Sequence, residues 1–182
     1  MPTKPTPRLE TDRLTLEPLG PEVAPEMVAV LADASLYTFI GGGPPTVDEL
    51  AARYRGWARG APRRDDAWHN WVVRLADDGQ AIGHVQATVI DDGREADIAW
   101  VIGTRWQGRG YASEAAQALV EWLEAGGTTT ITAHVHPGHA ASARVAANAG
   151  LERTTDVENG EIVWRRTANS NAKPGVPDQV RG

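Results

Sequence analysis

The sequence contains no cysteine among its 182 residues. This absence excludes a disulfide framework, a thiol nucleophile and a thiolate metal site, so any catalysis must use other groups. The sequence also lacks an apolar run near the ~20 residues that a membrane helix requires. Residues 1–7 contain prolines where a secretory signal would have an apolar segment. We therefore expect a cytoplasmic protein that does not bind membranes.

An excess of positive charge is missing as well. The 18 Lys and Arg residues are outnumbered by 24 Asp and Glu residues, which gives a formal net charge of -6. Such a chain presents no overall basic field to a phosphate backbone, although arginines concentrate between Arg53 and Arg64. We therefore expect no nucleic acid partner.

What is present indicates one globular domain. Hydrophobic residues make up 41% of the chain and charged residues 23%, the balance of an ordinary soluble domain. A single domain commonly holds ~100–200 residues, which suits this length. We predict a flexible N-terminus over 1–7, the domain over 8–166 and a disordered tail over 167–182, without an internal repeat.

Hydrophobic periodicity divides the domain into strands and helices. Alternating or β-branched runs predict strands over 8–19, 70–76, 81–90, 95–102, 128–135, 151–156 and 161–166. Helical spacing predicts helices over 21–34, 46 to about 57, 111–125 and 140–149, with a mobile Gly- and Pro-rich loop at 41–45. This order predicts an α/β (α+β) fold: a mixed, mostly antiparallel sheet of about six or seven strands with helices on both faces.

The most informative stretch is 101–114, where a strand passes through a glycine-rich turn into a helix. Gly108 and Gly110 allow unusual φ values and a close backbone approach. The free N–H groups and the positive dipole end of the following helix would then face an anion. This arrangement predicts a pyrophosphate-binding turn, with Arg105 or Arg109 either adding charge at its rim or being merely solvated.

Two other phosphate-binding loops fail on residue type. The dinucleotide fingerprint G-x-G-x-x-G requires a glycine where Ser113 stands, and the Walker loop requires a G-K-[ST] sequence that is absent. The remaining alternative is an ordinary glycine turn before a helix.

The hexapeptide QGRGYA at 107–112 matches the Q/R-x-x-G-x-G/A signature, and through it the chain resembles the GCN5-related N-acetyltransferase (GNAT) family. Three segments are similar to the branch typified by ribosomal-protein N-terminal acetyltransferases (RimJ/RimL-like): LETDRLTLEPL, ADIAWVIGTRWQGRGYASEA and AASARVAANAGL. Together with the predicted elements, the resemblance covers about residues 8–166 in the correct order.

The resemblance implies that acetyl-coenzyme A is the acyl donor. It also implies that the sheet splays between its fourth and fifth strands, where the acetyl-pantetheine arm enters with Val101 and Ile102 flanking the thioester. The residues that would bind the pyrophosphate through backbone amides are Gln107, Gly108, Arg109, Gly110, Tyr111 and Ala112, with Ser113 adding its hydroxyl.

A later family motif, N-x-x-S followed by G-[FL], runs here from His139 through Ser142 to residues 150–151. The family often has a Tyr or Ser on this helix near the coenzyme sulfur, so the resemblance implies that Ser142 protonates the departing thiolate. His139 replaces the usual Asn, and an imidazole can still donate a hydrogen bond to the coenzyme.

Transfer to an amine also needs a general base, because most amines are protonated at pH 7. Asp97 stands four residues before Val101 and hence on the same strand face, at a point where the resembling branch often has a Glu. We predict Asp97 as the base, with Glu95 and His84 as lesser candidates; a surface ion pair is the alternative for Asp97. A backbone N–H near Val101 would polarise the carbonyl.

His134, His136 and His139 form an H-x-H-x-x-H pattern whose first two imidazoles could share a strand face. No Cys, Asp or Glu nearby completes a metal site, so we predict none; the alternative is a set of histidines that line the acceptor pocket or are solvated.

The family builds its acceptor wall from the first two helices and their loops. The aromatic and basic residues in that region are Tyr37, Phe39, Trp57 and Trp68, with Arg53, Arg55, Arg59, Arg63 and Arg64. If these arginines lined the pocket, the acceptor would be anionic. The alternative for the aromatics is a place in the core.

We therefore predict an N-acetyltransferase that moves an acetyl group to a primary amine by direct transfer through a ternary complex. The acceptor would be a peptide N-terminus, an antibiotic or a small metabolite, and a homodimer is common in the family. Two alternatives stay open: a non-catalytic acyl-coenzyme A sensor, and an acyltransferase that uses a different or carrier-protein-borne acyl group.

Overall fold

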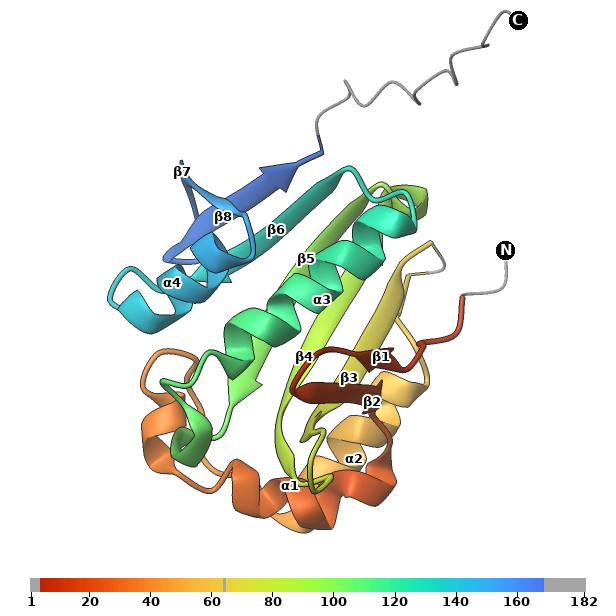
Figure 1. Cartoon of the computed structure of the whole chain (residues 1–182), viewed down its shortest axis with the longest axis vertical. Helices are drawn as coiled ribbons and strands as arrows, with labels where there is room; N and C mark the ends of the chain where they lie inside the picture. Colours follow the sequence, from red (N-terminus) through yellow and green to blue (C-terminus); the bar gives the residue numbers. More distant parts are fainter. Residues whose placement is uncertain (1–3, 64, 169–182) are drawn as a thin grey trace, which may run out of the picture.

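The computed structural model describes residues 4–63 and 65–168. Eight strands form one sheet in the order β1-β2-β3-β4-β5-β6-β8-β7 (Figure 1). The strands are β1 (Leu9–Glu10), β2 (Leu14–Pro18), β3 (Ala67–Leu75), β4 (Ala81–Ile90), β5 (Glu95–Ile102), β6 (Thr130–Val135), β7 (Glu152–Glu158) and β8 (Glu161–Thr167). Only β5 and β6 pair in parallel, so the predicted mixed and mostly antiparallel sheet is confirmed.

Helices cover both faces of this sheet, as predicted. They are α1 (Ala24–Val30), α2 (Val47–Ala58), α3 (Tyr111–Ala125) and α4 (Ala140–Asn148), with 3-10 turns η1 (Pro21–Val23), η2 (Ala34–Tyr37), η3 (Asp91–Gly93) and η4 (Thr104–Trp106). The α3 and α4 side holds the larger core cluster, which includes Trp71, Ile98 and Leu119. The α1 and α2 side holds the second cluster, around Met27 and Tyr54.

The strand count exceeds the predicted six or seven because the first predicted strand, 8–19, is not continuous. At residues 11–13 the chain turns, and both the backbone N–H and the hydroxyl of Thr11 bond to the Leu14 carbonyl oxygen, at 2.9 and 3.3 Å. Leu9 then pairs back onto Leu16 in a short hairpin. A polar hydroxyl that bonds its own backbone competes with strand pairing, which explains the break.

The parallel pair β5–β6 is short. Its register covers only Glu95 to Asp97 against Thr130 to Thr132, after which the two strands diverge. In Figure 1, β6, β8 and β7 turn away from the rest of the sheet toward the C-terminal end of β5. The fourth and fifth predicted strands, 95–102 and 128–135, correspond to β5 and β6, because the first predicted strand is split into β1 and β2. The predicted opening between them is therefore the gap between β5 and β6. The β6-facing backbone of 98–102 has no strand partner across this gap in the described chain.

Both ends of the domain extend slightly past the predicted boundaries. Thr6 Oγ1 lies 2.9 Å from His69 Nδ1, and Trp71 Nε1 donates to the Pro7 carbonyl oxygen at 2.7 Å. At the other end, the Ala168 N–H bonds to the Thr129 carbonyl oxygen at 2.8 Å. Residues 1–3 and 169–182, which hold most of the predicted flexible ends, lie outside the described residues. Within residues 4–63 and 65–168, no helix has the length and apolar character needed to cross a membrane.

Candidate active site

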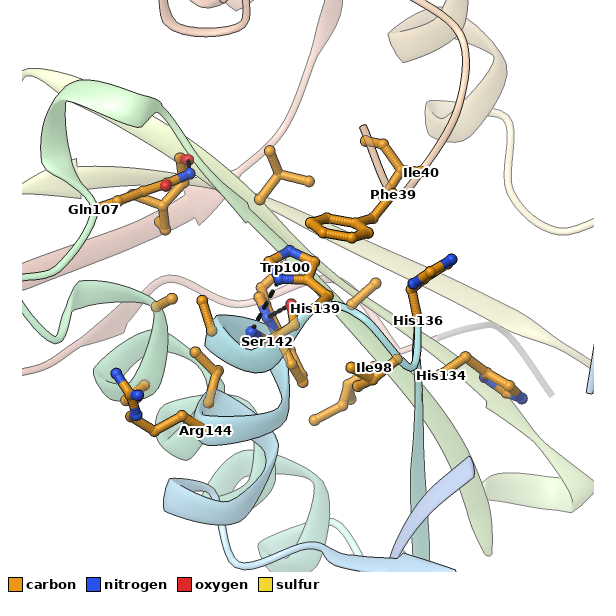
Figure 2. A pocket seen from close by; sticks show the side chains of 18 of the residues that line it. Phe39, Ile40, Ile98, Trp100, Gln107, His134, His136, His139, Ser142 and Arg144 are labelled. Carbon is orange, nitrogen blue, oxygen red and sulfur yellow. Dashed lines mark hydrogen bonds between the residues drawn. The ribbon is translucent and has the colours of Figure 1, made fainter. Parts of the chain in front are cut away.

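A cavity of about 750 Å³ fills the gap between β5 and β6. It is bounded by the glycine turn before α3, the first turns of α4, the loop after η2 and the tip of the β7–β8 hairpin (Figure 2). The predicted site residues that line it are Asp97, Val101, Ile102, Gln107, Gly108, Gly110, Tyr111, Ala112, Ser113, His139 and Ser142. The cavity thus brings together every predicted site residue except Arg109.

The floor of the cavity is the start of α3. Gly108 and Gly110 have φ values of 76° and 82°, in the left-handed region that favours glycine. Gly110 is the N-cap and supplies no side-chain cap, so the first N–H groups of α3, at residues 111–113, have no intrahelical partner. Unpaired donors at the positive end of a helix attract anions, so the turn has the geometry that the predicted pyrophosphate site needs.

A clamp that the sequence reasoning missed holds this turn in place. Glu114, in the first turn of α3, accepts hydrogen bonds from the Thr11 hydroxyl at 2.6 Å, from the Arg13 backbone N–H at 2.9 Å and from Arg13 Nε at 2.7 Å. Arg13 Nη1 also donates to the Arg109 carbonyl oxygen at 2.9 Å, and its guanidinium lies 4.6 Å from the centre of the Tyr111 ring. The signal was the polar ETDR run within the first predicted strand.

Two side chains of the predicted pyrophosphate set bind the protein itself. Gln107 Nε2 donates to the Ile102 carbonyl oxygen at 2.9 Å and so closes the turn. Ser113 Oγ accepts from Asn148 Nδ2 at 3.0 Å and links α3 to α4. Arg109 does not line the cavity, although its backbone carbonyl oxygen accepts a hydrogen bond from Arg13. Arg105 packs over Trp106 instead, with its guanidinium 5.6 Å from the ring centre.

Ser142 lies in the first turn of α4, opposite Trp100 of β5. Trp100 Nε1 donates to Ser142 Oγ at 3.2 Å, which leaves the serine O–H free to donate into the cavity. Figure 2 shows both side chains beside His139 at the centre of the cavity. Trp100 was not predicted as a site residue, because strand periodicity alone gives it no partner.

His139 caps α4 in place of the family's asparagine. Its Nδ1 accepts from the Ser142 backbone N–H at 3.3 Å, and its ring stacks on Phe39 with centroids 4.4 Å apart. Burial, together with the neighbouring His136, lowers the pKa of His139, so the ring is neutral. A neutral ring that accepts at Nδ1 carries its proton at Nε2, which is the atom able to donate to a ligand.

Asp97 lies at the apex of the gap, on the opposite sheet face from Ser142. Asp97 Oδ1 accepts from the Thr132 hydroxyl at 3.1 Å and lies 3.0 Å from His134 Nδ1. His134 Nε2 in turn lies 2.8 Å from Glu158 Oε2. Burial raises the pKa of Asp97, although the charge of His134 and the two hydrogen bonds oppose this. A carboxylate with a raised pKa in a cavity is suited to accept a proton.

The lesser candidates for the base lie elsewhere. Glu95 is exposed at the start of β5 and does not line the cavity. His84 faces α2, where its ring centroid is 5.9 Å from that of Trp57, and its buried Nδ1 finds no partner among the described residues. Burial, with a contribution from Arg53, lowers the pKa of His84 to about 4.

The H-x-H-x-x-H histidines have different hydrogen-bond partners, although His136 and His139 both pack against Phe39. His134 binds Asp97 and Glu158, whereas His136 Nδ1 accepts from the Gly138 N–H at 2.9 Å and packs beside Phe39. In the part of the chain that the structure describes, no group of three His, Asp or Glu side chains is arranged to hold a metal ion.

The acceptor wall differs from the prediction in its charge. Phe39 lines the cavity with Leu36 and Ile40, but the arginines of the α2 region are exposed and do not line it. Arg64 lies outside the described residues. The condition for an anionic acceptor is therefore not met, since the helix turns its arginines to solvent.

The lining residues that the sequence reasoning missed include the polar or charged side chains of Trp100, Arg144, Glu158 and Glu161. Arg144 follows Ser142 on α4, on the side of the cavity nearer the glycine turn. Glu158 and Glu161 flank the hairpin turn at residues 159–160. The turn was predicted, but nothing local in the sequence shows that its tip reaches the gap between β5 and β6.

Comparison with known proteins agrees with this geometry. An acetyltransferase (GNAT) domain model matches residues 13–152. An uncharacterized N-acetyltransferase, YnaD of Bacillus subtilis, is 32% identical over 91 residues, which are 50% of this chain and 54% of that protein. The chain thus aligns with about half the length of this relative.

Two solved structures share the fold at low sequence identity. The ribosomal-protein α-N-acetyltransferase RimL, in complex with coenzyme A, has a TM-score of 0.75 and 15% identity, with 91% of this chain and 100% of that chain covered. The aminoglycoside acetyltransferase AAC(6')-Ib, in complex with paromomycin and acetyl-coenzyme A, has a TM-score of 0.71 and 21% identity, with coverage of 86% and 94%. With the family model spanning most of the domain, the chain belongs to the GNAT acetyltransferase family.

Proposed function

We propose that this protein transfers an acetyl group from acetyl-coenzyme A to a primary amine by direct transfer in a ternary complex. One observation carries the proposal: a single cavity joins an uncapped helix N-terminus, an unpaired strand edge, a carboxylate and a hydroxyl. The first two features suit the donor, and the last two suit a proton transfer at each end of the reaction.

The donor half of the cavity fits acetyl-coenzyme A. The N–H groups at residues 108–113 would hold the pyrophosphate, and Arg144 would add the positive charge that the predicted Arg109 does not bring to the cavity. The open edge of β5 at Val101 and Ile102 would bind the amide groups of the pantetheine arm, and His139 Nε2 offers a further donor. The bound donor supplies an activated acetyl thioester.

The residues around the thioester position would divide the chemistry between the two sheet faces. Asp97 takes a proton from the acceptor ammonium, directly or through a water, and leaves a neutral amine. The backbone N–H of Ile102 would polarise the carbonyl, because the Val101 backbone faces β4 and the Ile102 backbone faces away from it. Ser142 accepts from Trp100, and its own hydroxyl proton is then directed to the departing sulfur. The proton that the amine nitrogen loses as the amide forms would restore the serine hydroxyl.

The acceptor half of the cavity favours a positively charged amine. Asp97, Glu158 and Glu161 line it, while among the described residues the one arginine in the lining is Arg144, near the donor half. Opposite charges raise the local concentration of a cationic substrate. A peptide N-terminus, an aminoglycoside and a small polyamine all satisfy this requirement, and proteins of similar fold act on the first two.

The proposal is tested by thermal unfolding with and without acetyl-coenzyme A, followed by thiol release with an octapeptide that begins with serine, ribostamycin and spermidine. A ligand at about 100 times its Kd stabilises the native state by about 2.7 kcal/mol, a readable shift in Tm. A shift with thiol release supports the proposal. A shift without release supports a sensor, and no shift contradicts the proposed donor site.

A further inference from the structure

Asp97, His134 and Glu158 form a continuous row from the apex of the cavity to its surface. His134 Nδ1 lies 3.0 Å from Asp97 Oδ1, and His134 Nε2 lies 2.8 Å from Glu158 Oε2. The three side chains come from β5, β6 and the end of β7, so only the folded chain brings them together. The transfer described above uses Asp97 as the base, and neither His134 nor Glu158 has yet been given a part in moving its proton.

The two carboxylates limit how His134 can be protonated. A neutral imidazole carries one N–H, so with two carboxylate neighbours one ring nitrogen donates and the other accepts, or the ring is charged. Burial of the ring lowers the pKa of His134, but the hydrogen bond to Glu158 and the charge of Asp97 outweigh this and raise it. The other titratable groups that line this part of the cavity are Glu161 of β8 and His136, which follows the end of β6.

Exposure is greatest at the Glu158 end of the same row. The His134 side chain is 27% exposed, and the Glu158 side chain is 61% exposed at the hairpin tip. Asp97 is 43% exposed, but its open side faces the cavity that the two substrates would fill. With both substrates bound, Asp97 would lose its direct route to bulk water, whereas Glu158 would keep one.

We propose that His134 relays to Glu158 the proton that Asp97 takes from the acceptor amine. The inference rests on the proposed function. The ammonium N–H bond breaks and an O–H bond forms on Asp97; this proton moves to His134 Nδ1 while the proton on Nε2 moves to Glu158. Glu158 releases it to water, so one proton leaves per acetyl group transferred. After the products leave, water returns a proton to Nε2 and takes the Nδ1 proton through Asp97, which then faces the open cavity, so the starting tautomer is restored. His134 acts through Asp97 and is a positioning residue.

The relay predicts a particular pH dependence. A charged His134 already holds a proton on Nδ1 and cannot accept one from Asp97, so kcat should rise with pH as His134 becomes neutral. Because the pKa of His134 is raised above its ordinary value of 6.5, this rise should lie above pH 6.5. Removing the Glu158 charge should lower the pKa of His134 and so move the rise of kcat to lower pH.

The experiment compares His134→Gln and Glu158→Gln with Asp156→Asn, which removes a carboxylate from the same hairpin but contacts Arg165 and not His134. The acceptor is whichever of the three probe amines the wild type acetylates fastest. In His134→Gln we expect kcat to fall about 100-fold and the rise with pH to disappear, with the Kd of acetyl-coenzyme A unchanged. Imidazole added to His134→Ala should restore turnover.

A second readout needs no acceptor. Imidazole NMR should show His134 titrating above pH 6.5 in the wild type and in Asp156→Asn, and at lower pH in Glu158→Gln. An active enzyme in which His134→Gln keeps kcat and its pH profile would overturn the relay alone. A folded His134→Gln variant with low kcat but the wild-type pH rise would also overturn it. A wild type that acetylates none of the probes would overturn the proposed function and the relay with it.

Discussion

The Nε atom of Arg13 lies 2.7 Å from Oε2 of Glu114 and joins the first hairpin to the helix that begins at the glycine turn. Arg13 also bonds the Arg109 carbonyl oxygen inside that turn. The conformation of the turn therefore depends on a segment almost a hundred residues earlier in the chain. An anion site made of backbone N–H groups is only as rigid as the loop that carries it, so this clamp would preorganise the proposed donor site.

We predict that Glu114→Gln destabilises the protein by about 1 to 2 kcal/mol, because it weakens three hydrogen bonds to a carboxylate, one of them to a half-exposed arginine. Burial alone would raise the pKa of Glu114, but the bonds from Thr11 and Arg13 outweigh it and lower the pKa. A carboxylate with a lowered folded-state pKa stabilises above its ordinary pKa of 4.5, and this stability is lost as pH falls through the folded value.

Urea unfolding of wild type and Glu114→Gln at pH 7 and near pH 3 measures this effect. The difference in unfolding free energy should be full at pH 7 and should shrink at the lower pH. Glu121→Gln, an exposed residue of the same helix, is the control and should differ little from the wild type at both. A difference that does not change with pH would show that the charge of Glu114 is unimportant.

Gly108→Ala and Gly79→Ala form a matched pair. Gly108 has a φ of 76° and Gly79 a φ of 74°, and an added Cβ would contact nothing within 4 Å at either position. Both changes should cost about 1 to 2 kcal/mol of stability through backbone strain alone. Only Gly108 lies in the proposed pyrophosphate turn, so Gly108→Ala should weaken acetyl-coenzyme A binding by about tenfold or more.

Calorimetric titration of both variants with acetyl-coenzyme A separates the two effects. Equal losses of affinity in Gly108→Ala and Gly79→Ala would argue against a phosphate site at this turn.

Asp97→Asn should lower kcat by about 100-fold while the Kd of acetyl-coenzyme A stays the same, because the change removes a proton acceptor and no donor-binding group. Glu95→Gln removes a carboxylate from the same strand, at an exposed position outside the cavity, and should retain full turnover. Steady-state thiol release with the fastest probe amine measures both. A kcat for Asp97→Asn equal to that of Glu95→Gln would leave Asp97 as an ion-pair residue only.

The sequence predicted those parts of the fold and site that local chemistry determines. Turns built on Asp-Gly and Asn-Gly pairs separate β3, β4 and β5 and join β7 to β8, and the glycines at 108 and 110 mark the anion turn. The missed features depend on distant pairing. The Glu114 clamp joins positions about a hundred residues apart, and the place of Glu158 depends on the irregular register between β7 and β8. Neither leaves a periodic signal in the sequence.

The contact between Trp100 and Ser142 also joins residues far apart in the sequence. It gives a test of Ser142 as the proposed acid. Ser142→Ala removes the hydroxyl, whereas Trp100→Phe removes the N–H that orients it and keeps the hydroxyl in place. If Ser142 protonates the leaving thiolate, Ser142→Ala should lower kcat by about 100-fold and Trp100→Phe by a smaller factor. Both variants should still bind acetyl-coenzyme A, since the glycine turn is unaltered.

The effect of the donor's leaving group completes this test. A thioester whose thiol has a lower pKa needs less help from an acid, so an aryl thioester of acetate should recover much of the rate lost in Ser142→Ala. The same donor should give little recovery in Asp97→Asn, because the base acts on the amine and not on the sulfur. Equal recovery in both variants, or none in Ser142→Ala, would show that the serine positions Trp100 and α4 and transfers no proton.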